Sequence, residues 1–305
     1  MSTQKPHASV YAWPKNHRGA VLLLVFCTIC WSIAGVFTRH LQRAESLEVT
    51  FWRSFFCVIA VTVVLSAQRQ HPIGSIIRMG KAGLISGSMW AVMFTCFMVA
   101  ITSTTVANTL LVSSLSPLFA AVLAWLVLGE RIRPGTVIAI AAALFGIWWM
   151  VRGGVSAQGL FGMTIALGVP MAAAVNLVVL RKMHTQVDLA PAVMLGALLS
   201  CLATLPFAWP LSATTNDLLI LALLGTVQLA IPCMLMVRVA KYLAAHEIAL
   251  IALLEIVLGT LWTWAWGGEA LNAATVQGGI MVLTALVGNE LLQASWLRRQ
   301  GAASA

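Results

Sequence analysis

Ten long apolar runs follow one another along this 305-residue chain, and no other feature constrains its fold as strongly. They lie at about residues 19–38, 49–67, 82–101, 105–128, 135–151, 160–180, 190–209, 218–239, 247–266 and 274–296. Each run is near the ~20 residues that a helix needs to cross about 30 Å of hydrocarbon. The connections between the runs are short, and no soluble domain fits there. The sequence therefore predicts an all-α integral membrane protein with ten transmembrane helices.

The composition agrees with a chain that lies in lipid. Hydrophobic residues make up 60% of it and charged residues only 9%, with a mean hydropathy of +0.94. Soluble domains carry about 25% charged residues, so this chain lacks the polar surface to cover a water-soluble globule. All six cysteines fall inside apolar runs, and Cys27-x-x-Cys30 has no second pair. Neither a disulfide framework nor a metal site is predicted.

The basic residues gather on one side of the predicted helix bundle. Ten helices put both chain ends on the same side, and that side collects 14 of the 18 Lys and Arg. They are Lys5, Lys15, Arg18, Arg69, Arg78, Lys81, Arg131, Arg133, Arg181, Lys182, Arg238, Lys241, Arg298 and Arg299. The positive-inside rule then places the tails 1–18 and 297–305 in the cytoplasm of a plasma or inner membrane. The net charge of +9 is a topology signal and a contact with anionic headgroups, so no nucleic-acid partner is predicted.

The second half of the chain repeats the first half at a shift of 139 residues. At this shift, residues 115–137 lie over residues 254–276. The identical pairs are Leu115 with Leu254, Trp125 with Trp264, Gly129 with Gly268, Glu130 with Glu269, Thr136 with Thr275 and Val137 with Val276. Matches outside the apolar runs, such as the Gly-Glu pair, favour an internal duplication over chance.

The duplication predicts two five-helix units, at residues 19–153 and 158–296. Because five is an odd number, the second unit enters the membrane from the opposite face. Glu130 then lies at the cytoplasmic end of its helix and Glu269 at the outer end of its own. Both are predicted to make helix-end or loop contacts rather than to bind substrate. Inverted repeats of this kind are common in secondary transporters, whose binding sites lie near the midplane where the halves meet.

A carboxylate interrupts the ninth run. Glu255 lies roughly midway along it, where an ionised carboxylate costs about 2.5 kcal/mol or much more. By helical spacing it shares a face with Ala252, Gly259, Trp262 and Trp266. This face suits a cavity that holds a cationic or zwitterionic group against Glu255 and the rest of the substrate against indole rings. The alternative is a structural glutamate, protonated or paired with a hydroxyl on a neighbouring helix.

Glu255 also suggests how transport is coupled. Low-dielectric surroundings disfavour its ionised form, so the carboxyl would alternate between a proton and a substrate amine. Competition between the two for one carboxylate yields proton-for-substrate exchange without other machinery. The intramembrane charges, Glu255 and Glu290 against Arg53, favour cationic or zwitterionic cargo.

Other polar and aromatic residues in the runs each leave two interpretations open. Glu290, late in the tenth run, either takes part in proton coupling or reaches the headgroups or a basic loop residue. Arg53, near the outer end of the second run, either binds a substrate carboxylate or extends to outer headgroups. Trp90, which shares a face with Phe94 and Met98, and Gln228 in the eighth run either line the cavity or make packing and interhelical contacts.

Four segments resemble the drug/metabolite transporter superfamily and, within it, the EamA-type proteins. They are CWSIAGVFTRHL (30–41), FWRSFF (51–56), ANTLLVSSLSPLFAAVLAWLVLGERI (107–132) and AAHEIALIALLEIVLGTLWTWAWGGEAL (244–271). The resemblance covers nearly the whole chain and implies the ten-helix, five-plus-five layout. It also implies transport without ATP, often export of amino acids or other small metabolites. The family fold would place Trp31, Ser32 and Asn176 around the central cavity.

One departure from the family concerns the ninth helix. The second copy often carries Glu-Pro where this chain has Glu255-Ile256, whereas Pro117 remains in the first copy. Proline removes an amide and clashes one turn back, so the serines at 113, 114 and 116 beside it can expose backbone carbonyls. The resemblance therefore predicts that the helix break is asymmetric between the two halves.

The sequence favours a secondary active transporter that exports an amino acid or other small cationic or zwitterionic metabolite. The alternatives are a membrane-embedded enzyme and a non-transporting receptor or scaffold. An enzyme would need a catalytic constellation, but Asp188 and Asp217 are both predicted in loops and no His-Glu-x-x-His occurs. No catalytic residues and no cofactor are predicted, and the absence of a P-loop motif argues against ATP as the drive. The substrate and the choice between monomer and homodimer stay open.

Overall fold

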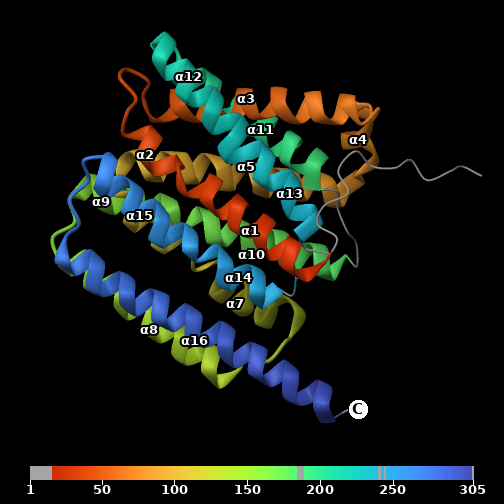
Figure 1. Cartoon of the computed structure of the whole chain (residues 1–305), viewed down its shortest axis with the longest axis vertical. Helices are drawn as coiled ribbons and strands as arrows, with labels where there is room; N and C mark the ends of the chain where they lie inside the picture. The colour runs from red at the N-terminus through yellow and green to blue at the C-terminus, as the bar shows by residue number, and fades with distance from the viewer. Residues whose placement is uncertain (1–15, 184–188, 240–241, 244, 304–305) are drawn as a thin grey trace, which may run out of the picture.

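The computed structural model describes residues 16–183, 189–239, 242–243 and 245–303, and the fold is a bundle of helices (Figure 1). In chain order the elements are α1 (His17–Ser32), α2 (Ala34–Thr38), α3 (Ser46–Ala67), α4 (Pro72–Arg78), α5 (Gly80–Ser103), α6 (Val106–Ser113), α7 (Ser116–Leu128), α8 (Pro134–Arg152), α9 (Ala157–Ala166), α10 (Gly168–Lys182), α11 (Leu189–Ala208), α12 (Thr215–Leu223), the π-helix η1 (Leu224–Ala230), α13 (Ile231–Val239), α14 (Ala245–Ala252), α15 (Leu254–Trp266) and α16 (Ala273–Ala303).

Ten stretches of this structure are long and apolar enough to cross a membrane, which confirms the predicted helix count. Five of them are continuous helices: α3, α5, α8, α11 and α16. The other five combine consecutive elements, namely α1 with α2, α6 with α7, α9 with α10, α12 with η1 and α13, and α14 with α15. The short α4, which the sequence analysis missed, connects the second span to the third.

The spans pack mainly through small residues. The fifth and tenth spans, α8 and α16, lie along each other at one side of the bundle (Figure 1). Their backbones come so close that a Cβ added to Gly146 would lie 2.8 Å from the carbonyl oxygen of Gly278. On the other side α11 packs against α3 and α5, and a Cβ on Gly196 would lie 2.5 Å from the Cβ of Trp90. Close approach through glycine is the usual basis of helix packing in lipid.

The repeated Gly-Glu pairs form the same local turn in both halves. Gly129 and Gly268 adopt left-handed backbone conformations, with φ of 72° and 68°, which glycine reaches without a steric cost. The amide of Glu130 donates to the carbonyl of Ala124 at 3.4 Å, and that of Glu269 donates to the carbonyl of Thr263 at 3.2 Å. Each glutamate therefore leaves its helix by the same backbone path.

The fourth and ninth spans both break in the middle, so the prediction of an asymmetric break is wrong. One break lies at Ser114–Leu115 and the other at Leu253, which is 139 residues after Ser114. In the first half Pro117 supplies no amide, and the Ser116 hydroxyl donates to the Ser113 carbonyl at 2.8 Å instead. In the second half the turn tightens without proline, because the Ile256 amide donates to the carbonyl of Leu253 at 3.1 Å.

The sequence predicts Asp217 in a loop, but this prediction is wrong, because Asp217 lies in the first turn of α12. It is fully buried and forms a capping box with Thr214. Its carboxylate also accepts hydrogen bonds from the amides of Gln42 at 2.7 Å and Arg43 at 3.1 Å. Asp217 therefore connects the start of the eighth span to the loop between the first two spans. Asp188 lies outside the described residues.

Candidate functional site

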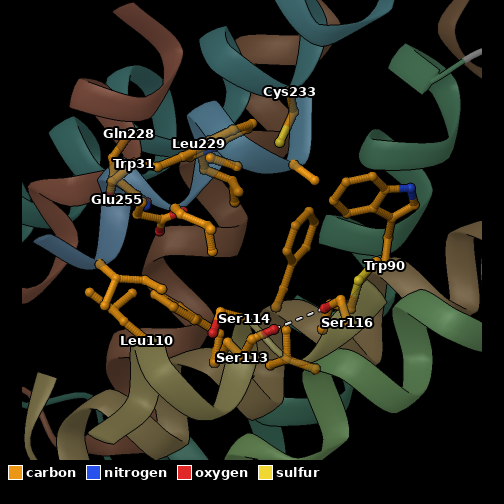
Figure 2. A pocket seen from close by; sticks show the side chains of 18 of the residues that line it. Trp31, Trp90, Leu110, Ser113, Ser114, Ser116, Gln228, Leu229, Cys233 and Glu255 are labelled. Carbon is orange, nitrogen blue, oxygen red and sulfur yellow. Dashed lines mark hydrogen bonds between the residues drawn. The ribbon is translucent and has the colours of Figure 1, made fainter. Parts of the chain in front are cut away.

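A cavity of about 420 Å³ opens inside the bundle, between the first, second, third, fourth, sixth, eighth and ninth spans (Figure 2). Its volume lies in the range of ligand pockets, about 300–1,000 Å³. Its lining is Trp31, Arg53, Trp90, Met93, Phe94, Phe97, Leu110, Ser113, Ser114, Ser116, Pro117, Val169, Gln228, Leu229, Cys233, Ala249, Ala252, Leu253, Glu255 and Ile256. Most of these side chains are apolar or aromatic, and few polar groups stand among them.

The two broken spans contribute to this cavity in matched pairs. The pairs are Leu110 with Ala249, Ser113 with Ala252, Ser114 with Leu253, Ser116 with Glu255 and Pro117 with Ile256. In every pair the second residue follows the first by 139 positions. The cavity therefore lies where equivalent parts of the two halves face each other. The residue types differ in every pair, and the one pair that introduces an ionisable group is Ser116 with Glu255.

Glu255 lies in the first turn of α15, directly after the break at Leu253. It is partly buried, and its side chain borders the cavity. In Figure 2 it lies near Trp31 and Gln228. Among the described residues no hydrogen bond or ion pair engages its carboxylate, although the charge of Arg53 acts on it from a distance. The start of α15 adds favourable dipole potential for a negative group.

Arg53 faces the interior of the bundle, so the interpretation as a headgroup anchor is wrong. Arg53 lies about two turns into α3 and is only 2% exposed. Its Nε and Nη2 both donate to Oε1 of Gln228, at 3.1 and 2.9 Å. The guanidinium carbon lies 5.9 Å from the ring centre of Phe94 and 5.8 Å from that of Phe97, within cation–π range. Its Nη1 has no hydrogen-bond partner among the residues that the structure describes.

Gln228 reaches Arg53 from the π-helix η1, which the sequence analysis missed. Its Nε2 also donates to the backbone carbonyl of Trp31 at 3.3 Å, so one amide connects the first, second and eighth spans. Single turns of π-helix are rare and occur often at functional sites. Gly225, in the same turn, lets α3 approach, because an added Cβ would lie 2.5 Å from the Arg53 carbonyl oxygen.

Four residues of the predicted site lie outside the lining of this cavity, on or against α15. The indole Nε1 of Trp262 donates to the hydroxyl of Ser32 at 3.1 Å. Trp266 is 64% exposed and packs against Trp262, with ring centres 5.4 Å apart. Gly259 is a packing position, where an added Cβ would lie 2.6 Å from Cδ1 of Leu110. Of the predicted face, Ala252 and Glu255 border the cavity.

Trp90 lines the cavity, whereas the two remaining polar candidates do not. The Trp90 ring lies 5.4 Å from that of Phe94, and within the described part of the chain its buried Nε1 has no hydrogen-bond partner. The same holds for the buried Oδ1 of Asn176, in α10. Glu290 is 4% exposed in α16, where it accepts a hydrogen bond from Asn289 at 3.4 Å. Asn289 in turn accepts one from Thr136 of α8 at 2.8 Å, so Glu290 belongs to the α8–α16 interface.

Glu269 makes the helix-end contacts that the sequence predicted. Its carboxylate accepts hydrogen bonds from Nη2 of Arg39 at 3.0 Å and from the amide of Val106, which begins α6, at 3.0 and 3.2 Å. Arg39 also donates to the carbonyl of Thr104 at 2.8 Å. Glu130, its counterpart, makes a long contact of 3.9 Å with Nη1 of Arg181, and both of these side chains are more than half exposed.

Comparisons with known proteins identify a family, two related transporters and a shared fold. A model of the EamA-like transporter family matches residues 18–152 and again residues 160–289. The pseudopaline exporter CntI of Pseudomonas aeruginosa (strain UCBPP-PA14) is 22% identical over 276 residues, covering 88% of this chain and 95% of that protein. An uncharacterized transporter of Archaeoglobus fulgidus is 23% identical over 275 residues, covering 90% and 97%. A solved crystal structure, 18% identical, shares the fold with a TM-score of 0.61 and covers 90% of this chain and 98% of its own.

Proposed function

Because the chain belongs to the EamA-like transporter family, we propose that it is a secondary active transporter that exports a small cationic or zwitterionic metabolite. The observation that carries the proposal is the carboxylate of Glu255, which borders a cavity between the two halves and has no partner among the described residues. An unpaired carboxylate inside a membrane bundle is costly unless a proton or a cation neutralises it. A substrate amine supplies that cation. A relative at 22% identity is named as an exporter, which supports the direction.

Glu255 couples the substrate to protons in this proposal. A proton and a substrate amine compete for the one carboxylate, so release of the amine on one side accompanies protonation there. No ATP, cofactor or catalytic residue is required. The same exchange at a site between two inverted halves is a common arrangement of secondary transporters.

Arg53 supplies the group for the substrate's negative end. Two of its guanidinium nitrogens are held by Gln228, and Nη1 is left for a carboxylate. The rings of Phe94 and Phe97 flank the guanidinium, so a carboxylate reaches Nη1 after one ring turns aside. A cargo with an amine toward Glu255 and a carboxylate toward Arg53 is a zwitterion of amino-acid type. Trp31 and Trp90 then contact its remaining part.

The site of action follows from the charge pattern. The basic loops support an orientation with both chain ends in the cytoplasm, in keeping with the positive-inside rule, and the exporter named among the relatives supports the cell membrane as the location. Loading from the cytoplasm and release outside constitute export. The substrate and the lipid bilayer are the partners that this function needs.

Counterflow in proteoliposomes tests the proposal directly. Purified protein is reconstituted in pure liposomes that are preloaded with an unlabelled amino-acid mixture, and entry of labelled amino acids is measured. We expect preloading to stimulate entry of at least one zwitterionic or cationic amino acid. Glu247→Gln, on the same span but outside the cavity lining, is the matched control for Glu255→Gln. Absence of counterflow for every zwitterionic and cationic metabolite tested would contradict the proposed cargo class, and an enzymatic conversion in the same liposomes would contradict transport.

A further inference from the structure

The two glutamates that the repeat relates, Glu130 and Glu269, have the same backbone conformation but different side-chain contacts. Both follow a left-handed glycine, and both amides close the same turn onto the helix before them. The Glu269 carboxylate forms an ion pair with Arg39 at 3.0 Å and accepts a hydrogen bond from the first amide of α6. Its side chain is 15% exposed. Glu130 is 3.9 Å from Arg181, and its side chain is 56% exposed. Because the local turns match, the difference comes from how the neighbouring spans are arranged at the two ends.

The partners of the two glutamates occupy similar places in the two halves. Arg39 directly follows the first span of its half, and Arg181 is the penultimate residue of the first span of the other half, 142 positions later in the chain. Val106 begins α6, and the residue 139 positions later, Ala245, begins α14. The contact of Glu269 with Arg39 and the Val106 amide thus has a counterpart in Glu130, Arg181 and the Ala245 amide.

Helix packing also differs between the Glu269 end and the Glu130 end of the bundle. The half-span helices α6 and α15 pack against each other, and the side chain of Leu110 contacts Gly259 where they meet. Their counterparts under the repeat are α14 and α7. No comparable packing joins α14 to α7 in the described part of the chain. At the Glu269 end the charged contact and the α6–α15 packing are both formed, whereas at the Glu130 end the charged contact is long and no comparable α14–α7 packing is found among the described residues.

We propose that these two clusters are a pair of alternating gates, one at each end of the cavity. The Glu269 gate (Arg39, Glu269 and the Val106 amide) is formed in the present conformation. The Glu130 gate (Arg181, Glu130 and the Ala245 amide) forms in the opposite conformation, when the two halves exchange arrangements and the Glu269 gate opens. A charge-assisted hydrogen bond to a helix N-terminus is strong enough to bias such an equilibrium. This inference rests on the proposed transport function but not on the identity of the cargo.

Side-specific labelling of a cavity cysteine tests the gates. Ala252→Cys places a thiol in the cavity lining, and an impermeant thiol reagent is applied to intact cells or to inverted membrane vesicles. The parent protein, which retains its six native cysteines, gives the background. Glu269→Gln weakens the formed gate, so labelling should shift toward the Glu269 end by roughly tenfold, the equivalent of about 1.4 kcal/mol. Glu130→Gln should shift labelling toward the Glu130 end.

Two further variants keep the test decisive if a glutamate variant does not fold. Arg39→Gln should act in the same direction as Glu269→Gln, and Arg181→Gln in the same direction as Glu130→Gln. Opposite shifts from the two matched pairs support the gates, whereas shifts in the same direction, or no shift, overturn them. Labelling requires no transported substrate. Unchanged labelling in a protein that transports would therefore reject the gates alone, and shifted labelling without any transport would count against the proposed function alone.

Discussion

Arg53 is tolerated in the bundle interior because other groups replace the water that its guanidinium would have outside. Gln228 accepts two of its hydrogen bonds, and Phe94 and Phe97 present their ring faces to its charge. Removing one partner from a buried charged group leaves the other uncompensated, which costs more than the contact itself contributes. The Arg53–Gln228 contact is therefore expected to be important for stability as well as for binding.

Gln228→Leu tests this expectation. The substitution leaves Nε and Nη2 of Arg53 without an acceptor, so the folded state should lose about 1–3 kcal/mol. Thermal unfolding in detergent, followed by a thiol-reactive dye, should show a clearly lower melting temperature. Gln277→Leu is the matched control, since Gln277 is exposed and its side chain accepts a hydrogen bond from the indole of Trp149 at the surface. Equal melting temperatures for the two variants would contradict the account of Arg53.

Substitutions of Trp90 and Trp266 compare a tryptophan that lines the cavity with one at the surface. Trp90 lines the cavity, whereas Trp266 is 64% exposed outside it. Trp90→Ala should weaken substrate affinity by roughly tenfold, the equivalent of about 1.4 kcal/mol, because the part of the substrate that packs on the indole loses that apolar surface. Trp266→Ala should leave affinity close to that of the parent. The concentration dependence of counterflow gives the substrate affinity of both variants. A larger loss of affinity in Trp266→Ala than in Trp90→Ala would contradict this assignment and indicate that substrate binds to the tryptophan face of α15.

At this scale the sequence predicted the charged groups of the site better than the aromatic ones. Glu255 was identifiable because a carboxylate midway along a membrane run demands a reason. Trp262 and Trp266 follow Glu255 on the same face of the continuous helix α15, but helical spacing does not show how far along that face the cavity extends. The cavity lining ends near Glu255, and further along α15 the indole of Trp262 bonds Ser32 while Trp266 is exposed.

Among the elements, the pair α8 and α16 shows how small residues hold two spans together. Gly146→Leu should separate them, because even a Cβ at this position would lie 2.8 Å from the Gly278 carbonyl oxygen. Overpacking of this kind costs about 1–3 kcal/mol. The melting temperature of the variant should fall, whereas Gly288→Leu, where no atom lies within 4 Å of an added Cβ, should change it little. A stable Gly146→Leu protein would contradict the observed helix contact.

Spans were predictable from sequence, but the breaks within them were only partly so. Pro117 signals the break in the fourth span, since it lacks an amide. The ninth span carries no proline at the equivalent Ile256, and its break at Leu253 depends on a tightened turn that leaves no mark in the residues. The π-helix around Gln228 has no sequence signature either. Such local changes of helix type arise from packing between spans, which hydrophobic periodicity does not contain.

For the whole molecule, the shift of 139 residues connects the sequence to the site. It was visible in the chain as matched Gly-Glu and Thr-Val pairs, and in the structure it relates the cavity residues of the fourth and ninth spans and the glutamates of the two proposed gates. The sequence could not show which gate is formed, because both halves carry the same glutamate. That choice belongs to the arrangement of spans in one conformation. An inverted repeat permits both arrangements, which is what alternating access requires.

The most direct test of the account is proton-driven transport by Glu255→Gln. Glutamine keeps the shape of the side chain but neither releases a proton nor neutralises an amine. In proteoliposomes with the acidic side opposite the loaded side, the parent protein should transport its zwitterionic substrate faster than without a pH gradient. Glu255→Gln should fold and insert normally but show no response to the gradient, while Glu247→Gln responds like the parent. Transport by Glu255→Gln with the parent's pH dependence would contradict the account and leave Glu255 a structural residue.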